Sequence, residues 1–215
     1  MAPQHITAIA TLIGVALLLV FGERTQSTRA RVVLKGPTSA GFIATAVLSG
    51  CLDSDWGRWI FAGLVCSWFG DVLLISAKRA AFLAGLVAFL LGHVAYTVAF
   101  YDRGIDVMGG LLPVLALGVV AVGLVARWLL PKVDPAMMRP VLAYMVVITA
   151  MVAFAGGTVA AHGGPLLLVG AVLFWLSDVS VATDRFAGGG FINRVWGLSF
   201  YYGAQLLLAL SSGTA

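Results

Sequence analysis

The pattern of apolar and polar positions divides the chain into eight long apolar runs, separated by short breaks that are charged or rich in turn-forming residues. Each run has about the 20 residues that an α-helix needs to cross the hydrocarbon core of a bilayer. The sequence therefore predicts an all-α, polytopic membrane protein, a bundle of eight transmembrane helices forming a single integral membrane domain over residues 1–215. The predicted spans are residues 5–22, 34–51, 57–76, 80–101, 107–128, 138–161, 164–183 and 193–212.

Composition excludes a water-soluble fold. The chain is 61% hydrophobic and 10% charged, whereas an ordinary soluble domain is roughly 25% charged. The first span is apolar enough to be taken for a secretory signal. However, no basic residue precedes Ile6, and Glu23-Arg24 follows where a cleavage site would have small residues. We therefore expect the first span to remain as a helix.

The positive charges lie mostly on one side of the predicted membrane. Two arginines, Arg58 and Arg103, flank the even-numbered loops. The other eleven basic residues lie in or beside the loops that follow odd-numbered spans: Arg24, Arg29, Arg31, Lys35, Lys78, Arg79, Arg127, Lys132, Arg139, Arg185 and Arg194. Because cytoplasmic loops carry the excess of Lys and Arg, both termini are predicted to lie outside a multi-pass cell-membrane protein. The net charge of +4 follows from this topology and does not indicate a nucleic-acid partner.

Two aspartates lie inside apolar spans in near-copies of one phrase. Trp68-Phe69-Gly70-Asp71-Val72 recurs, 107 positions later, as Trp175-Leu176-Ser177-Asp178-Val179. The second and sixth predicted spans also start alike, with a basic residue before Pro37 and before Pro140, and proline is tolerated in the first turn of a helix. These matches suggest a four-plus-four pseudo-repeat, with chance similarity between apolar segments as the alternative.

The two aspartates share a depth in the membrane. Asp71 precedes Lys78, and Asp178 precedes Arg185, by seven residues, so both lie about 10 Å inside the cytoplasmic boundary. Other polar residues of the spans are Lys35, Thr38, Tyr144, Asn193, Tyr201, Tyr202 and Gln205 in the same half, and His93 and Tyr96 nearer the midplane. A bundle that turns these faces inward has a polar cavity toward the cytoplasmic leaflet.

Several of these residues also have a purely structural interpretation. His93 can be a core histidine that bridges helices, and one of Tyr201 and Tyr202 can belong to the interfacial aromatic belt. Lys35 either snorkels to the headgroups or binds a lipid phosphate. A carboxylate in hydrocarbon is costly, so Asp71 and Asp178 are functional candidates by default.

Other catalytic chemistries find little support. Ser67 lies one turn before Asp71, but no histidine is placed by sequence to activate it. Asp71, Asp178 and His93 are a thin ligand set for zinc, and no metal is predicted. Nucleotide and dinucleotide motifs are missing, so no organic cofactor is predicted either.

At these positions the chain resembles the YhhN family of membrane proteins, which includes lysoplasmalogenases. The resemblance covers nearly the whole length. It rests on Lys35-x-Pro37, Ser67-x-x-Gly70-Asp71, Gly85 with His93-x-x-Tyr96, Ser177-Asp178 and Tyr202-x-x-Gln205. Gly36 separates Lys35 from Pro37, where the family more often has Lys-Pro.

The resemblance implies an eight-helix hydrolase that cleaves the vinyl-ether bond of lysoplasmalogens into a fatty aldehyde and a glycerophospho-base. That chemistry needs one protonated acid and one ionised carboxylate, as glycosidases do for a related oxocarbenium ion. We expect Asp71 and Asp178 to divide these roles, without an assignment of which is the acid. The expected substrate-binding residues are Lys35, His93, Tyr96, Tyr144, Asn193, Arg194, Tyr202 and Gln205.

Two other classes of function use the same residues differently. In a proton-coupled transporter or lipid flippase, Asp71 and Asp178 would be coupling sites. In a lipid-binding or assembly protein, the two aspartates would have no function. The expected partners in the hydrolase are a lysophospholipid substrate and membrane lipids.

Overall fold

The computed structural model describes residues 1–76 and 78–213, and in these residues it contains eight α-helices and no strand. The predicted all-α bundle is confirmed. The helices are α1 (Pro3–Leu17), α2 (Thr28–Leu48), α3 (Asp55–Leu73), α4 (Arg79–Arg103), α5 (Leu112–Leu129), α6 (Pro135–His162), α7 (Leu166–Phe186) and α8 (Phe191–Ser211). A π-helical segment, Leu18–Arg24, continues α1.

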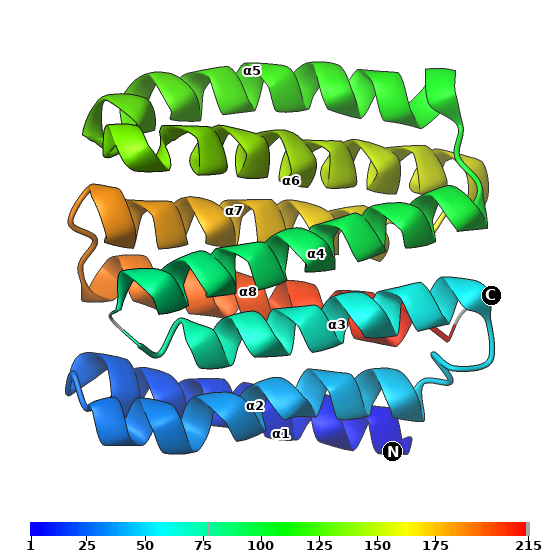
Figure 1. Cartoon of the computed structure of the whole chain (residues 1–215). Helices are drawn as coiled ribbons and strands as arrows, with labels where there is room; N and C mark the ends of the chain where they lie inside the picture. The colour runs from blue at the N-terminus through cyan, green and yellow to red at the C-terminus, as the bar shows by residue number, and fades with distance from the viewer. Residues whose placement is uncertain (77, 214–215) are drawn as a thin grey trace.

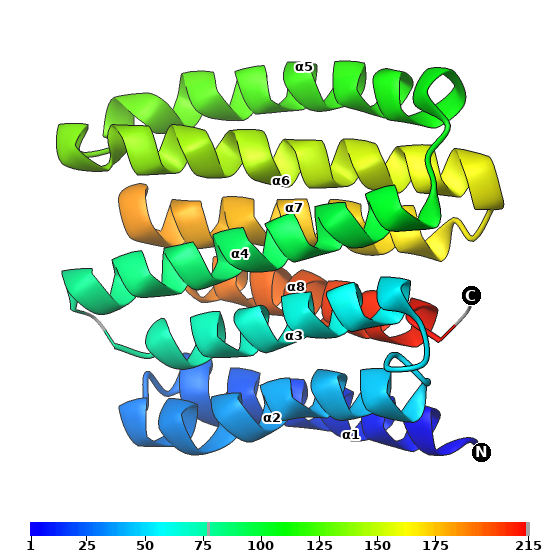
Figure 2. The same ribbon diagram turned by 45° about the vertical axis from the view of Figure 1, so that its right-hand side comes forward.

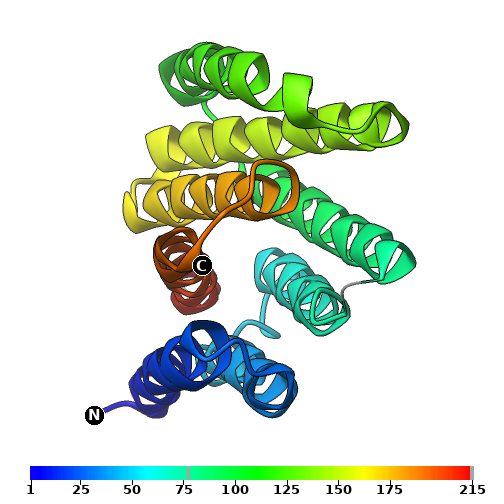
Figure 3. The same ribbon diagram turned by 90° about the vertical axis from the view of Figure 1, so that its left-hand side faces the viewer.

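The helices run up and down, so their connections lie at two opposite ends (Figure 1). The pair α1 and α2 forms one edge of the molecule and α5 forms the other. Between these edges, α3 and α4 lie on one side and α7 and α8 on the other, as the turned views show (Figures 2 and 3). Both termini lie at the end that carries the α2–α3 and α4–α5 connections.

Close packing of α3 on α4 depends on glycines. A Cβ atom at Gly63 would overlap the ring of Tyr96, and one at Gly92 would lie 3.1 Å from the backbone oxygen of Gly63. Small residues allow helices to approach closely where lipid supplies no hydrophobic drive for association. This approach places His93, next to Gly92, deep in the bundle, where its side chain is 0% exposed.

Among the described residues, five helical segments are long and apolar enough to cross a membrane by length and composition: Pro3–Arg24, Arg79–Arg103, Val107–Lys132, Pro135–His162 and Leu166–Phe186. Helix α5 presents Leu117, Val120 and Leu124 outward, each more than 60% exposed, as a lipid-facing helix does. The chain is therefore a polytopic membrane bundle. Helices α2, α3 and α8 have a lower mean hydropathy because they carry more charged and polar residues, which include residues of the site described below and Arg58 at the other end of α3.

Two predicted helix starts were wrong. Helix α2 begins at Thr28, where the Ser27 hydroxyl accepts a hydrogen bond from the Ala30 N–H, and not at residue 34. Helix α6 begins at Pro135. Pro37 and Pro140 therefore lie inside helices and not in first turns. At α2 the apolar run was interrupted by Arg29 and Arg31, although Arg is a good helix former.

Candidate active site

Asp71 is held by donors from two other helices. Its side chain, on α3, lies among groups of α2 and α8 and is almost completely buried. The hydroxyls of Ser39 and Tyr201 each donate a hydrogen bond of 2.6 Å to Oδ2. Lys35 Nζ lies 3.1 Å from Oδ1. Two short hydrogen bonds and one ion pair are the surroundings that stabilise an ionised carboxylate.

Both tyrosines of α8 belong to this network, so the placement of one of them in an interfacial aromatic belt was wrong. Tyr202 is fully buried, and its hydroxyl lies 2.9 Å from Ser39 Oγ. The two rings face inward because helix α8 packs against α2 and α7. Ser39 therefore links Tyr202 to Asp71.

Asp178, on α7, forms a second centre with a histidine and a tyrosine. Its Oδ2 lies 3.1 Å from His93 Nε2 on α4 and accepts a 2.9 Å hydrogen bond from the Tyr144 hydroxyl on α6. His93 Nε2 and the Tyr144 hydroxyl are 2.9 Å apart. His93 does bridge helices, but it does so through its contact with the Asp178 carboxylate. Among the described residues, no Lys or Arg forms an ion pair with Asp178.

The two centres are built from equivalent helices. Asp71 on α3 receives its bonds from α2 and α8, and Asp178 on α7 receives its bonds from α6 and α4. In a four-plus-four arrangement, α2 corresponds to α6 and α4 to α8, so each aspartate is held by the helix before it and by the last helix of the other half. This correspondence supports the pseudo-repeat.

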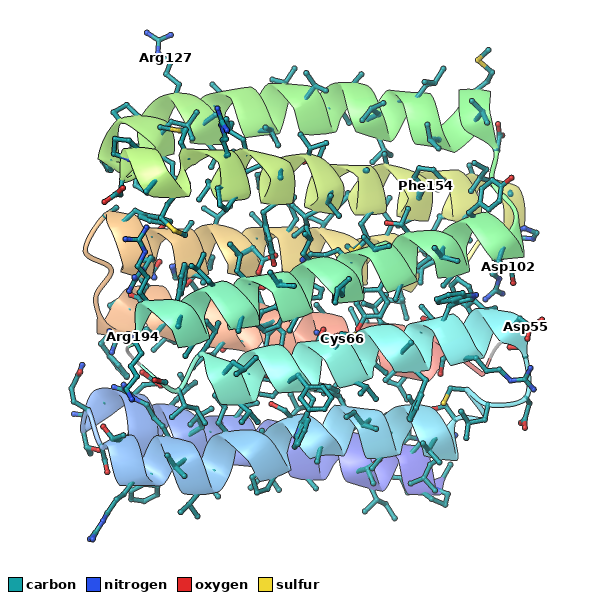
Figure 4. The ribbon with its side chains drawn as sticks, viewed as in Figure 1. Asp55, Cys66, Asp102, Arg127, Phe154 and Arg194 are labelled. Carbon is teal, nitrogen blue, oxygen red and sulfur yellow. The ribbon has the colours of Figure 1, made fainter. Side chains whose placement is uncertain are left out.

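Both aspartates line one polar cavity of about 360 Å³. The shared polar cavity that the sequence predicts is therefore present. Phe89 also lines it, with its ring centre 5.8 Å from that of Tyr201 and 6.2 Å from that of Phe174. The other charged groups of the lining are Glu23, Arg31, Lys35, Asp184, Arg185 and Arg194. Arg194 lies at the end of the bundle opposite to Asp55 and Asp102 (Figure 4).

An apolar groove of about 70 Å³ adjoins the polar cavity. It lies among α4, α5, α6 and α7 and is lined by apolar side chains that include Leu86, Val125 and Ile148. Asp178 and Phe82 line both the groove and the cavity. The Asp178 carboxyl group therefore lies where the polar cavity meets the apolar groove.

The other residues predicted to bind substrate lie at different distances from these spaces. Tyr144 lines the groove, and Lys35 and Arg194 line the cavity. His93 and Tyr202 line neither space but contact residues that do: His93 contacts Asp178 and Tyr144, and Tyr202 contacts Tyr201. Tyr96 and Gln205 are fully buried and bonded to each other, with 2.7 Å between Tyr96 OH and Gln205 Oε1.

Asn193 has a structural role. Its amide donates a 2.9 Å hydrogen bond to the backbone oxygen of Ser180, and the Ser180 hydroxyl donates one of 2.9 Å to the backbone oxygen of Asn193. These reciprocal bonds fasten α7 to α8. Asn193 is not in the lining of either space.

Lys35 does not snorkel to the headgroups, because its ammonium group is paired with Asp71. Sequence reasoning missed Ser39, although it follows Lys35 by four residues and so lies on the same helix face. It also missed Glu23, whose carboxylate is 3.2 Å from Arg31 and 3.4 Å from Arg194. No local signal marks Glu23, because its partners are on other segments.

In the described part of the chain, Ser67 is not arranged as a nucleophile, and no cluster of metal-ligating side chains is found. Ser67 Oγ is buried without a hydrogen-bond partner among these residues, so no base is in place to activate it. Over residues 1–76 and 78–213, no three His, Cys, Asp or Glu side chains come together as metal ligands.

Comparison with known proteins identifies the family. The YhhN family model matches residues 30–212, which is most of the chain. The chain belongs to the YhhN family. All of the helices that carry the two aspartate centres lie inside the matched region, apart from the first residues of α2. No solved structure matches the chain.

Curated relatives of the chain are named lysoplasmalogenases. "Lysoplasmalogenase TMEM86A" of Bos taurus is 34% identical over 164 residues, which are 71% of this chain and 64% of the relative. "Lysoplasmalogenase TMEM86B" of Homo sapiens is 35% identical over 173 residues, 80% of this chain and 70% of the relative. The aligned part thus spans somewhat less than two thirds of the bovine relative.

Proposed function

We propose that this YhhN-family protein hydrolyses the vinyl-ether bond of a lysoplasmalogen-type lysophospholipid, releasing a fatty aldehyde and a glycerophospho-base. The observation that carries the proposal is the pair of aspartate centres on one cavity that adjoins an apolar groove. The printed names of the curated relatives support the same activity.

The shapes and charges of the two spaces suit such a lipid. We expect the alkenyl chain to enter the apolar groove and the glycerophospho headgroup to lie in the charged cavity, because the linings match in polarity. The vinyl ether, which joins the two parts of the substrate, then lies beside Asp178 at the junction. Burial of the chain supplies binding free energy in proportion to the apolar area removed from water.

In our proposal Asp178 is the proton donor. Protonation of the outer alkene carbon breaks the C=C π bond and leaves an oxocarbenium ion. The Asp178 carboxylate then takes a proton from water as the water oxygen bonds to the cationic carbon. The hemiacetal collapses to aldehyde and alcohol, so the net reaction consumes one water. The proton taken from water restores the acid, so the cycle needs no other proton source, and His93 and Tyr144 hold the carboxyl group in position.

Asp71 has the complementary role. Its ion pair with Lys35 and its bonds from Ser39 and Tyr201 hold the carboxyl group in a fixed position on the cavity. A fixed negative charge facing the cavity stabilises the oxocarbenium ion as the positive charge develops. The two carboxyl groups thus differ in role because their partners differ, as paired carboxylates do in glycosidases.

The test of this function is a comparison of two lipids. Purified protein is incubated with lysoplasmalogen and with its saturated-ether analogue, and aldehyde is quantified. We expect aldehyde from the vinyl ether alone, since a saturated ether has no alkene carbon to protonate. If the protein hydrolyses neither lipid but moves both across vesicle membranes, the transporter or flippase would be favoured instead.

We also propose that both termini lie outside the cell, with the cavity toward the cytoplasmic leaflet. The cavity lies at the end of the bundle opposite to the termini, where most of the basic residues are found. We expect His5→Cys to react with an impermeant thiol reagent from outside and Thr25→Cys only after permeabilisation. Both positions are exposed.

The labelling needs a background in which Cys51 and Cys66 are replaced. Gly213 is a poor labelling position, because a Cβ there would overlap the backbone oxygen of Ser49. The reverse labelling pattern would overturn the orientation and would place the cavity in the outer leaflet.

A further inference from the structure

Arg185 differs from the other cationic side chains that line the polar cavity. Those side chains are each held by a carboxylate: Arg31 by Glu23 at 3.2 Å, Lys35 by Asp71 at 3.1 Å, and Arg194 by Asp184 at 2.8 Å. Within residues 1–76 and 78–213, Arg185 has no ion pair and no hydrogen bond from its guanidinium group. Its donors are therefore available to an anion.

The guanidinium group is nevertheless held in place. Its central carbon lies 4.4 Å from the centre of the Phe82 ring. A cation over an aromatic face is attracted by the ring quadrupole, and stacking leaves the N–H groups at the guanidinium edge unoccupied. Arg185 is thus positioned without being neutralised.

The position of Arg185 coincides with the junction between the two spaces. Phe82 lines both the polar cavity and the apolar groove, and Phe186, the next residue of α7, lines the groove. Arg185 follows Asp178 by two turns, a rise of about 10 Å. Side chains of a helix lean toward its N-terminus, which directs Arg185 back toward Asp178.

We propose that Arg185 binds the phosphate of the lysophospholipid. This inference rests on the proposed function and adds a binding residue to it. With the chain in the groove and the vinyl ether beside Asp178, the glycerol spacer brings the phosphate to the guanidinium group. The planar donor fork of arginine pairs with two phosphate oxygens at once. Lys35, which the sequence suggested for this role, and Arg194, which the sequence suggested for substrate binding, are already engaged in ion pairs.

The first experiment compares two substrates in phosphate-free detergent micelles. One is a lysoplasmalogen and the other is the 1-alkenylglycerol with the same chain and no phosphate. We expect Arg185→Gln to raise KM for the lysoplasmalogen by at least about tenfold, the usual effect of losing a hydrogen bond to a charged group, with kcat within about twofold. KM for the alkenylglycerol should match that of the wild type, and Arg185→Lys should recover part of the loss.

Arg127→Gln is the matched control. Arg127 is an exposed arginine at the same end of the bundle, on α5, and lines neither space (Figure 4). An unchanged KM for lysoplasmalogen in Arg185→Gln would overturn the inference, and so would an equal rise for both substrates. An effect seen in phospholipid bilayers but not in micelles would assign Arg185 to bulk headgroups, which also overturns it.

A binding experiment separates this inference from the proposed function. Trp175 lines the groove, so its fluorescence can report binding of a saturated 1-alkyl lysophospholipid that cannot be hydrolysed. Weaker binding of this lipid to Arg185→Gln, with equal binding of 1-alkylglycerol, would support the phosphate site even if no lipid were hydrolysed. Equal binding of both lipids would overturn the site even in an active hydrolase. Displacement of the lysophospholipid by micromolar inorganic phosphate would identify a free-phosphate site instead.

Discussion

Replacement of Asp178 by asparagine is expected to lower kcat for lysoplasmalogen hydrolysis by at least about 100-fold, the lower end of the effect of losing general acid–base catalysis. Asparagine has nearly the same shape, and its amide oxygen can still accept the 2.9 Å bond from Tyr144. It has no acidic proton to give to the alkene carbon. KM should therefore change little, and the kinetic loss should appear in kcat as aldehyde release is followed over time.

Asp102→Asn provides the control for this variant. Asp102 is an exposed carboxylate at the opposite end of the bundle (Figure 4). If both Asp178→Asn and Asp102→Asn hydrolysed the lipid at nearly the wild-type rate, Asp178 would not be the acid. The transporter would then better explain why a carboxyl group is kept at this depth.

The eight helices could be predicted because the bilayer fixes the length of each apolar run. Their starts could not be predicted equally well. Residues 28–34 of α2 include Arg29 and Arg31, so this segment does not read as a membrane span, yet it is helical and capped by Ser27. Hydropathy detects the part of a helix that lies in hydrocarbon and does not detect the turns that extend beyond it.

The centres of the site could be predicted because a carboxylate among apolar residues is costly wherever it lies. Their partners could be predicted only as polar positions. Ser39 and Tyr201 bond to Asp71 across 32 and 130 positions of sequence, and such pairings depend on how α2, α3 and α8 pack. For the same reason, no pattern in the sequence separates Asn193, which fastens α7 to α8, from residues that line the cavity.

Replacement of Asp71 by asparagine is expected to reduce both hydrolysis and stability. Hydrolysis should fall by at least about 100-fold, because the fixed negative charge opposite the oxocarbenium ion is lost. Stability should fall by about 3 kcal/mol, because Lys35 would keep a charge with no counter-charge in a position where its side chain is only 14% exposed. Aldehyde release and thermal unfolding in detergent measure the two effects.

The double variant Asp71→Asn with Lys35→Met distinguishes catalysis from folding. It removes both charges, so its unfolding temperature should return toward that of the wild type, while hydrolysis should stay as low as in Asp71→Asn. The double variant Asp71→Asn with Asp178→Asn should lose much less hydrolytic activity than the product of the two single losses, because the effects of residues that act as a unit are not additive. If activity returned along with stability when Lys35→Met is added to Asp71→Asn, Asp71 would serve to neutralise Lys35, and Asp178 would carry the chemistry without it.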